Sequence, residues 1–309
     1  MCNYNTLSKK FLQYKNFCGY SYKSDSIILK EIVNFLEENN IKEITKQTVE
    51  KYARLNPNIK QNTLVRNMVV FKEFNKYLKL QGIDCYQIPN KVYAKKDKDF
   101  VAYTFTYDEI KQIYNSLKNF TYDYHYSYYN QLSYPLIIKI LYQTGIRIGE
   151  LLNIKVMDYN GELFILRKTK NNQERTIMIP ESLKKDLLKF HNKFHNDSKE
   201  LFFKNSSNSV GTFFKKILRM SKIKITDNGP RLHDLRHTFI VHSIERMRKS
   251  GKDLKICLPV LQSHVGHQSL ESLSYYFHMN NDILHELKNV SERKLSYLIP
   301  EMIDGDDYE

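Results

Sequence analysis

The sequence predicts a mainly α fold: an N-terminal unit of four helices, then a larger, mostly helical unit with a small antiparallel sheet. Apolar residues recur at helical spacing through most of the 309 residues. A clear strand pattern occurs only around residues 163–179. A polar, lysine-bearing stretch divides the chain, which is long enough for two cores. We therefore expect units at 1–86 and 103–300, a linker at 87–102 and an acidic tail at 301–309.

Four amphipathic segments make up the predicted N-terminal unit. Thr45 is a suitable N-cap for the third helix, and Gly82 is a suitable end for the fourth. The predicted helices are residues 6–17, 26–38, a third that begins near 44, and 61–80. The residues expected in their core include Ile27, Ile28, Ile32, Phe35 and Leu36, followed by Leu64, Val69, Phe71, Phe74, Tyr77 and Leu78.

Polar and basic residues cluster where the fourth helix begins. Backbone N–H groups at a helix N-terminus, together with such side chains, can bind phosphate groups. A solvated polar face explains the same pattern about as well. Lysines in the linker could follow a nucleic-acid backbone. The candidate DNA-binding residues are Lys60, Asn62, Thr63 and Arg66 on the helix and Lys95 and Lys96 in the linker.

Helices also dominate the predicted second unit. Gly145 ends a strongly apolar helix at 134–143, and a further helix is expected through 150–154. Strands at 163–166 and 175–179 flank a polar turn and so predict a hairpin. The remaining predicted helices are residues 106 onward, 181–194, 210–221, 233–248, 253–264, 270–277 and 282–298.

The composition indicates a polyanionic partner. The formal net charge is +14, although simple solubility is an alternative explanation of a basic chain. The four cysteines are far apart, without CxxC pairs or histidine partners at metal-site spacing, so we expect reduced thiols, no metal and a cytoplasmic protein. No stretch approaches the roughly 18 apolar residues of a membrane span.

The most informative residues are basic and aromatic side chains at fixed spacings. Arg147 comes two residues after Gly145, and His233 and Arg236 lie three apart on one predicted helix face. His267 precedes Tyr276 by nine residues. Arginine offers a planar fork of donors to a phosphodiester, whose non-bridging oxygens gain charge under attack. Positive charge also favours the phenolate form of a tyrosine, so the pattern predicts a site where a phenol attacks a phosphodiester.

Three motifs together resemble those of the tyrosine recombinase, or phage integrase, family. They are residues 144–151 (TGIRIGEL), residues 233–237 (HDLRH), and Gly266 and His267 followed by Tyr276. HxxR alone occurs by chance, whereas all three motifs in order on a basic, two-part chain are specific. The N-terminal unit is similar to the family's core-binding, SAM-like domain, and the second unit to its catalytic domain.

The resemblance implies strand exchange between paired sites in double-stranded DNA through a covalent 3′-phosphotyrosyl intermediate, without a cofactor. It implies two domains clamped around the duplex and a tetramer on synapsed DNA that exchanges C-terminal helices in trans. Packing of residues 282–298 in cis is the alternative. Integration or excision of a mobile element is the favoured role, resolution of chromosome dimers is another, and an accessory DNA-bending protein is compatible with both.

The resemblance also assigns roles to residues. Tyr276 is the nucleophile, and its neighbour Tyr275 is the competitor. The proton donor to the leaving 5′-oxygen is Lys170, favoured by its spacing to Arg175, or Lys168, which forms a Lys-Thr pair. The implied catalytic set is Arg147, Lys170, His233, Arg236, His267 and Tyr276.

Several alternatives remain beside this assignment. Glu150 could orient Arg147, or it could lie on a solvated helix face. Asp234 is expected to cap or orient, not to react. An inactive DNA-binding protein of the same fold would need a broken motif, and we find none. Relaxation of DNA by the same pocket acting alone, as in type IB topoisomerases, is a further rival.

Overall fold

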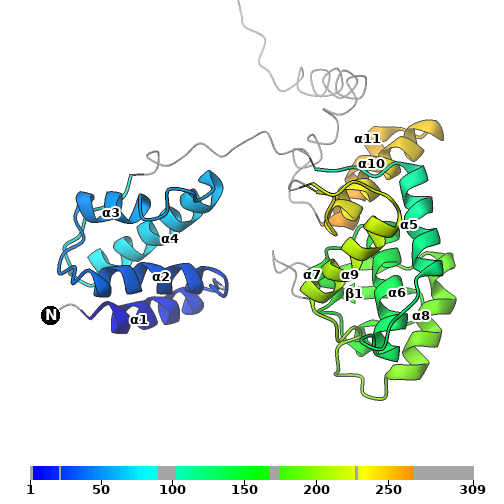
Figure 1. Cartoon of the computed structure of the whole chain (residues 1–309), viewed down its shortest axis with the longest axis horizontal. Coiled ribbons are helices and arrows are strands. Elements are labelled where there is room, and N and C mark those ends of the chain that lie inside the picture. Colours follow the sequence, from blue (N-terminus) through cyan, green and yellow to red (C-terminus); the bar gives the residue numbers. More distant parts are fainter. Residues whose placement is uncertain (1–2, 21, 90–101, 168–173, 227–228, 267–309) are drawn as a thin grey trace, which may run out of the picture. The chain divides into compact units, whose positions relative to one another are not determined.

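The computed structural model describes residues 3–20, 22–89, 102–167, 174–226 and 229–266. The chain divides into two compact units, residues 1–100 and 101–309. Helices dominate the described residues of both units. The described residues of the second unit also form a two-stranded antiparallel sheet (Figure 1). The predicted mainly α fold with a small sheet is confirmed. Within these ranges no helix is long and apolar enough to cross a membrane.

The described part of the first unit contains four helices packed around an apolar core. They are α1 (Tyr4–Phe17), α2 (Asp25–Glu38), α3 (Lys46–Ala53) and α4 (Gln61–Leu80). Phe11, Phe71 and Phe74 are fully buried between them. Thr45 forms a capping box with Thr48 at the start of α3, as its residue type predicts.

Two residues predicted in this core are instead exposed. Ile27 on α2 is 64% exposed and Val69 on α4 is 48% exposed. Each residue turns a helix by about 100°, so Val69 points away from Phe71, which is two residues later. By the same count Ile27 points away from Leu36, nine residues later. Both predictions were wrong because apolar runs on these helices extend beyond the buried face.

The second unit begins with α5 (Tyr107–Asn119) and α6 (Tyr128–Thr144). Its other described elements are α7 (Ile148–Leu151), the 3₁₀ helix η1 (Val156–Asp158), β1 (Leu163–Leu166), β2 (Arg175–Met178), α8 (Glu181–Phe194), α9 (Ser207–Met220), α10 (Asp234–Lys249) and α11 (Leu254–Val265). The apolar helix α6 contacts α8, α9 and α10 (Figure 1). In the hairpin, Leu163 pairs with Met178 and Leu166 with Arg175, so the predicted antiparallel pairing is confirmed.

Several predicted boundaries in the second unit differ from the structure. α6 begins at Tyr128 and continues through Pro135, so it is longer than the predicted 134–143. The helix expected through 150–154 ends at Leu151, and the Ile154 carbonyl beyond it accepts a hydrogen bond from the Phe202 backbone at 2.8 Å. The helices predicted at 270–277 and 282–298 lie outside the described residues.

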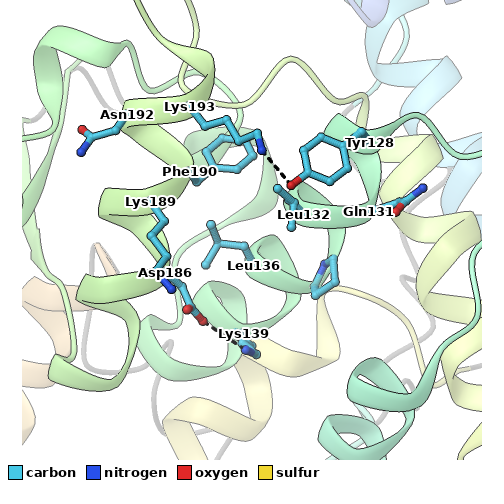
Figure 2. Close-up of a pocket in the computed structure, with 11 residues that line it drawn as sticks. Tyr128, Gln131, Leu132, Leu136, Lys139, Asp186, Lys189, Phe190, Asn192 and Lys193 are labelled. Carbon is cyan, nitrogen blue, oxygen red and sulfur yellow. Dashed lines mark hydrogen bonds and ion pairs between the residues drawn. The ribbon is translucent and has the colours of Figure 1, made fainter.

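A hollow of about 670 Å³ opens between α6 and α8 (Figure 2). Its lining includes the apolar side chains of Leu136 and Phe190. Lys193 donates to the Tyr128 hydroxyl at 2.8 Å on one side of it. None of the three motifs contributes a residue to this hollow.

Candidate active site

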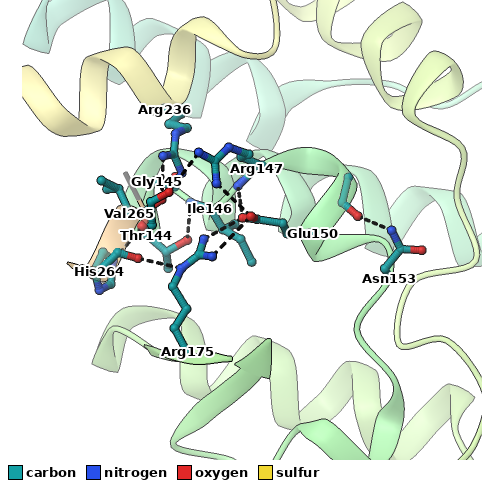
Figure 3. Close-up of polar contacts among 12 residues, drawn as sticks. Thr144, Gly145, Ile146, Arg147, Glu150, Asn153, Arg175, Arg236, His264 and Val265 are labelled. Carbon is teal, nitrogen blue, oxygen red and sulfur yellow. Dashed lines mark hydrogen bonds and ion pairs between the residues drawn. The ribbon is translucent and has the colours of Figure 1, made fainter. Parts of the chain in front are cut away.

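A tight turn at the C-terminus of α6 positions Arg147. Gly145 ends α6 in the left-handed region, with φ at +64°. A Cβ atom on Gly145 would lie 2.2 Å from Cδ1 of Phe239, so only glycine fits without moving that ring. The chain is extended again at Arg147, which is the N-cap of α7. The turn therefore brings the Arg147 side chain to the end of α6 (Figure 3).

Glu150 links Arg147 to Arg175 (Figure 3). Its Oε1 accepts from Arg147 Nη1 at 2.9 Å and from Arg175 Nη1 at 3.3 Å. Its Oε2 accepts from the Arg147 backbone N–H at 3.2 Å and from Arg175 Nη2 at 2.7 Å. Burial opposes ionisation of Glu150, but these bonds and charges prevail and lower its pKa below 4.5. The solvated-face interpretation is wrong, because the Glu150 side chain is only 12% exposed.

Arg236 is buried where two helices end. The residue is 2% exposed, and it donates from Nη1 to the Gly145 carbonyl and from Nη2 to the Val265 carbonyl, both at 2.6 Å. Carbonyls at helix C-termini lack partners within their own helix and carry partial negative charge, so they suit a guanidinium. Arg147 Nη2 donates to the next carbonyl of the chain, that of Gly266, at 3.2 Å. Both predicted arginines therefore bind adjacent carbonyls at the end of α11.

Two residues that the sequence analysis did not assign to the site also bind these helix ends. Arg175 Nε donates to the His264 carbonyl at 3.0 Å. His264 Nε2 lies 2.8 Å from the Thr144 carbonyl, and because a carbonyl only accepts, this nitrogen carries the proton. Burial lowers the pKa of His264 below 6.5, which favours the neutral ring. A basic residue at the start of an apolar strand was the available signal for Arg175, whereas His264 had none beyond its closeness to His267.

His233 lies at the N-cap of α10 with an exposed side chain. Neighbouring atoms remove part of the ring from water, and this desolvation, followed by the charge of Arg236, lowers its pKa below 6.5. A neutral imidazole can donate or accept a hydrogen bond. The His237 ring centroid is 4.9 Å from that of His233. Asp234 is fully buried and accepts from the Arg231 backbone N–H at 2.6 Å, which is the orienting role expected of it.

The cluster as a whole is positively charged and partly open. Arg147 and Arg175 share one carboxylate, Glu150, while Arg236 bonds backbone carbonyls, so these four side chains together carry two net positive charges. The Arg147 side chain is 34% exposed, so it is the most accessible of the three. Such a group can bind an anion with charge-assisted hydrogen bonds. Within the described ranges no three His, Cys, Asp or Glu side chains are grouped to hold a metal ion.

The structure brings together three residues of the predicted catalytic set, Arg147, His233 and Arg236. The two arginines bind adjacent carbonyls, and the positive charges of both act on the His233 ring. Gly266, which directly precedes His267 in the chain, belongs to the cluster through its carbonyl. The other predicted residues, namely Lys168, Lys170, His267, Tyr276 and its competitor Tyr275, lie outside the described residues.

The candidate DNA-binding residues of the first unit face solvent at the start of α4. Lys60, Asn62, Thr63 and Arg66 are all exposed. Arg66 pairs with Asp25 through Nε at 3.1 Å and Nη2 at 2.7 Å, so its guanidinium is already shared with a carboxylate. The linker lysines Lys95 and Lys96 lie outside the described residues. DNA binding by these residues stays a prediction.

Residues 104–282 match the Phage integrase family. Tyrosine recombinase XerA from Pyrococcus furiosus is similar to this chain, with 32% identity over 181 residues that cover 55% of the chain and 57% of XerA. The chain thus spans just over half the length of that relative.

Two solved structures share the fold. The XerH site-specific recombinase bound to difH substrate has a TM-score of 0.65 at 17% identity, covering 94% of this chain and 84% of that one. A lambda integrase tetramer bound to a Holliday junction has a TM-score of 0.56 at 16% identity, covering 87% of this chain and 78% of that one. The family match extends over more than half of the chain and contains all three motifs. The chain therefore belongs to the phage integrase family.

Proposed function

We propose that this chain is a tyrosine-type site-specific recombinase, which cuts and rejoins double-stranded DNA through a covalent bond to Tyr276. The observation that carries the proposal is the arrangement of Arg147 and Arg236 on adjacent carbonyls at the end of α11. This places two fixed positive charges near the exposed imidazole of His233. Membership of the phage integrase family and similarity to a protein named tyrosine recombinase support the same activity.

In the proposed reaction, guanidinium groups stabilise the charge that develops on the non-bridging oxygens of the scissile phosphate. The Tyr276 oxygen forms a bond to phosphorus as the bond to the 5′-oxygen breaks. Lys170, or alternatively Lys168, gives a proton to that leaving oxygen, while His233 and His267 assist proton transfer at the phenol. A 5′-hydroxyl of another strand then attacks the phosphotyrosyl bond and releases the tyrosine. Arginine charges supply the stabilisation that a metal ion supplies in other phosphoryl-transfer sites.

The first unit and the linker would provide contacts to the DNA backbone. Lys60, Asn62, Thr63 and Arg66 are exposed together at one helix end, which suits phosphate binding. Such contacts hold and orient a duplex without reading its sequence. Lys95 and Lys96 of the linker would add electrostatic attraction, in keeping with the net charge of +14.

The active assembly would be a tetramer on two paired DNA sites. Residues 282–298 carry an apolar set at helical spacing that must be buried, and donation to a neighbouring protomer would bury it. The lambda integrase structure, a tetramer bound to a Holliday junction, supports such an assembly. Packing in cis is the alternative. We further propose a cytoplasmic protein that integrates or excises a mobile element, with chromosome-dimer resolution as the second candidate role.

Trapping the covalent intermediate tests the proposed function. Nicked duplexes tiled across the genomic DNA that flanks the gene would be incubated with the full-length chain and analysed by denaturing electrophoresis. We expect an SDS-resistant protein–DNA adduct at one site and strand exchange when two copies of that site are supplied. Binding without any adduct would indicate an inactive DNA-binding protein. An adduct with relaxation but no exchange between sites would indicate topoisomerase-like activity.

A further inference from the structure

We propose that Arg175 is a positioning residue for strand cleavage, which holds Glu150 so that the charge of Arg147 remains available to the scissile phosphate. This inference rests on the proposed function. Arg175 is the first residue of β2, and it belongs to none of the three motifs. Its guanidinium nevertheless reaches into the polar cluster, between His264 and Glu150 (Figure 3).

Arg175 joins three separate parts of the second unit. Nη1 and Nη2 donate to the two oxygens of Glu150, which lies on α7. Nε donates to the His264 carbonyl in the last turn of α11. The arginine itself is fixed on the hairpin by its pairing with Leu166. Its side chain is 12% exposed, so these contacts are made away from bulk water, where charge-assisted bonds are stronger.

The guanidinium also packs against the backbone of Gly266. A Cβ atom on Gly266 would lie 2.7 Å from Arg175 Nη1 and 2.8 Å from Cζ, and Gly266 has φ at +65°. Glycine is therefore needed for both the turn and the close approach. Because the Gly266 carbonyl accepts from Arg147, Arg175 contacts both groups that bind the Arg147 side chain, namely Glu150 and Gly266.

The charges explain why a second arginine is required. Glu150 receives four hydrogen bonds, two from Arg147 and two from Arg175. Without Arg175, the buried carboxylate would have one guanidinium partner, and Arg147 with Glu150 would form a neutral ion pair. Arg147 would then attract a phosphate less strongly, since its charge would already be compensated. With Arg175 present, the three groups keep one net positive charge, and Arg147 can donate its remaining N–H groups to an anion.

The variant Arg175→Lys tests this proposal, because a single ammonium cannot bond to both Glu150 oxygens and the His264 carbonyl together, which leaves Glu150 more strongly paired with Arg147. The substrate is the nicked flanking-DNA duplex that traps the adduct. We expect single-turnover cleavage to fall by about 100-fold, as for a small misplacement of a reacting group. We expect the Kd for the same duplex to change by less than about threefold. The control Arg167→Lys makes the same change on the other hairpin arm, where arginine bonds Asp158 at 2.6 Å, and should cleave normally.

A neutral substrate separates positioning from support of the fold. If the scissile phosphate carries a methyl group in place of one non-bridging oxygen, it has one negative charge less for Arg147 to stabilise. The cleavage defect of Arg175→Lys should then shrink to within about fivefold of wild type, because cleavage of this substrate depends less on the charge that Arg147 presents. An equal defect on both substrates would overturn the proposal, as would undiminished cleavage of the charged one.

If Arg175→Lys does not fold because the Glu150 carboxylate is left under-bonded, the double variant Glu150→Gln/Arg175→Lys removes that carboxylate and keeps the proposal testable. Arg175 should act on cleavage through the carboxylate, so this double variant should cleave as Glu150→Gln alone does. Independent, multiplying losses would overturn the proposal. If the wild-type chain itself forms no adduct, the proposed function fails and this inference fails with it. Wild-type cleavage with normal Arg175→Lys cleavage contradicts the inference alone.

Discussion

The substitution Gly145→Ala should destabilise the second unit and disturb the site at once. An L-residue in the left-handed region costs roughly 1–2 kcal/mol. The added Cβ would lie 2.2 Å from Phe239 Cδ1, and displacing a packed ring typically costs about 1–3 kcal/mol. We therefore expect the free energy of unfolding to fall by roughly 2–5 kcal/mol, a large share of the ~5–15 kcal/mol of a typical domain. Because the Gly145 carbonyl accepts from Arg236, cleavage should fall as well.

Urea denaturation of the full chain, followed by fluorescence and circular dichroism, measures this change. Gly149→Ala is the matched control, since a Cβ on Gly149 meets no atom within 4 Å. It should be neutral or stabilising by about 0.5–1 kcal/mol, as alanine favours a helix over glycine. In a Phe239→Ala background, Gly145→Ala should cost only the backbone part of this loss, because the steric contact is absent there. A Gly145→Ala protein within about 0.5 kcal/mol of wild type would refute the reasoning.

Three further predictions follow from the same contacts. Arg147→Lys and Arg236→Lys should each reduce cleavage by about 100- to 1000-fold in single-turnover assays. Arg236→Lys should also lower the free energy of unfolding, because Arg236 is only 2% exposed. Near-normal cleavage by both variants would show that the two arginines have only a structural role. The lowered pKa of Glu150 means that its stabilising contribution is present above the unfolded pKa near 4.5 and lost as pH falls through the folded value. The difference in unfolding free energy between wild type and Glu150→Gln should therefore shrink from about pH 7 to about pH 3, and a constant difference would contradict this. Ending the chain after Asn281 should preserve monomer folding and DNA binding but abolish tetramers and strand exchange, as measured by light scattering on paired sites; an unfolded product would show that the terminal helix packs in cis.

Local signals predicted most of the fold. The capping box at Thr45 and the left-handed glycine at Gly145 are decided by neighbouring residues, and the sequence located both. The buried faces of α2 and α4 were less certain, since Ile27 and Val69 extend the apolar runs onto exposed sides. Patterning alone does not say which part of a wide apolar surface meets another helix.

The contacts within the site could not be predicted in the same way. Motif spacing identified Arg147 and Arg236, but the partners of Arg236 are carbonyls 91 and 29 residues away. His264 reaches the Thr144 carbonyl across 120 residues, and Arg175 reaches the His264 carbonyl across 89. These bonds depend on where α6 and α11 end relative to each other, which is a property of tertiary packing. Backbone acceptors also carry no residue-type signal in a sequence.

Mass spectrometry of the covalent protein–DNA adduct tests the central claim most directly. The adduct formed on a nicked flanking-DNA duplex would be digested with protease and nuclease, and the residue that carries the nucleotide would be identified by fragmentation. We predict a single modified residue, Tyr276, and loss of the adduct in Tyr276→Phe but not in Tyr275→Phe. Modification of Tyr275, or an unmodified chain after incubation with every flanking site, would contradict the proposed phosphotyrosyl mechanism.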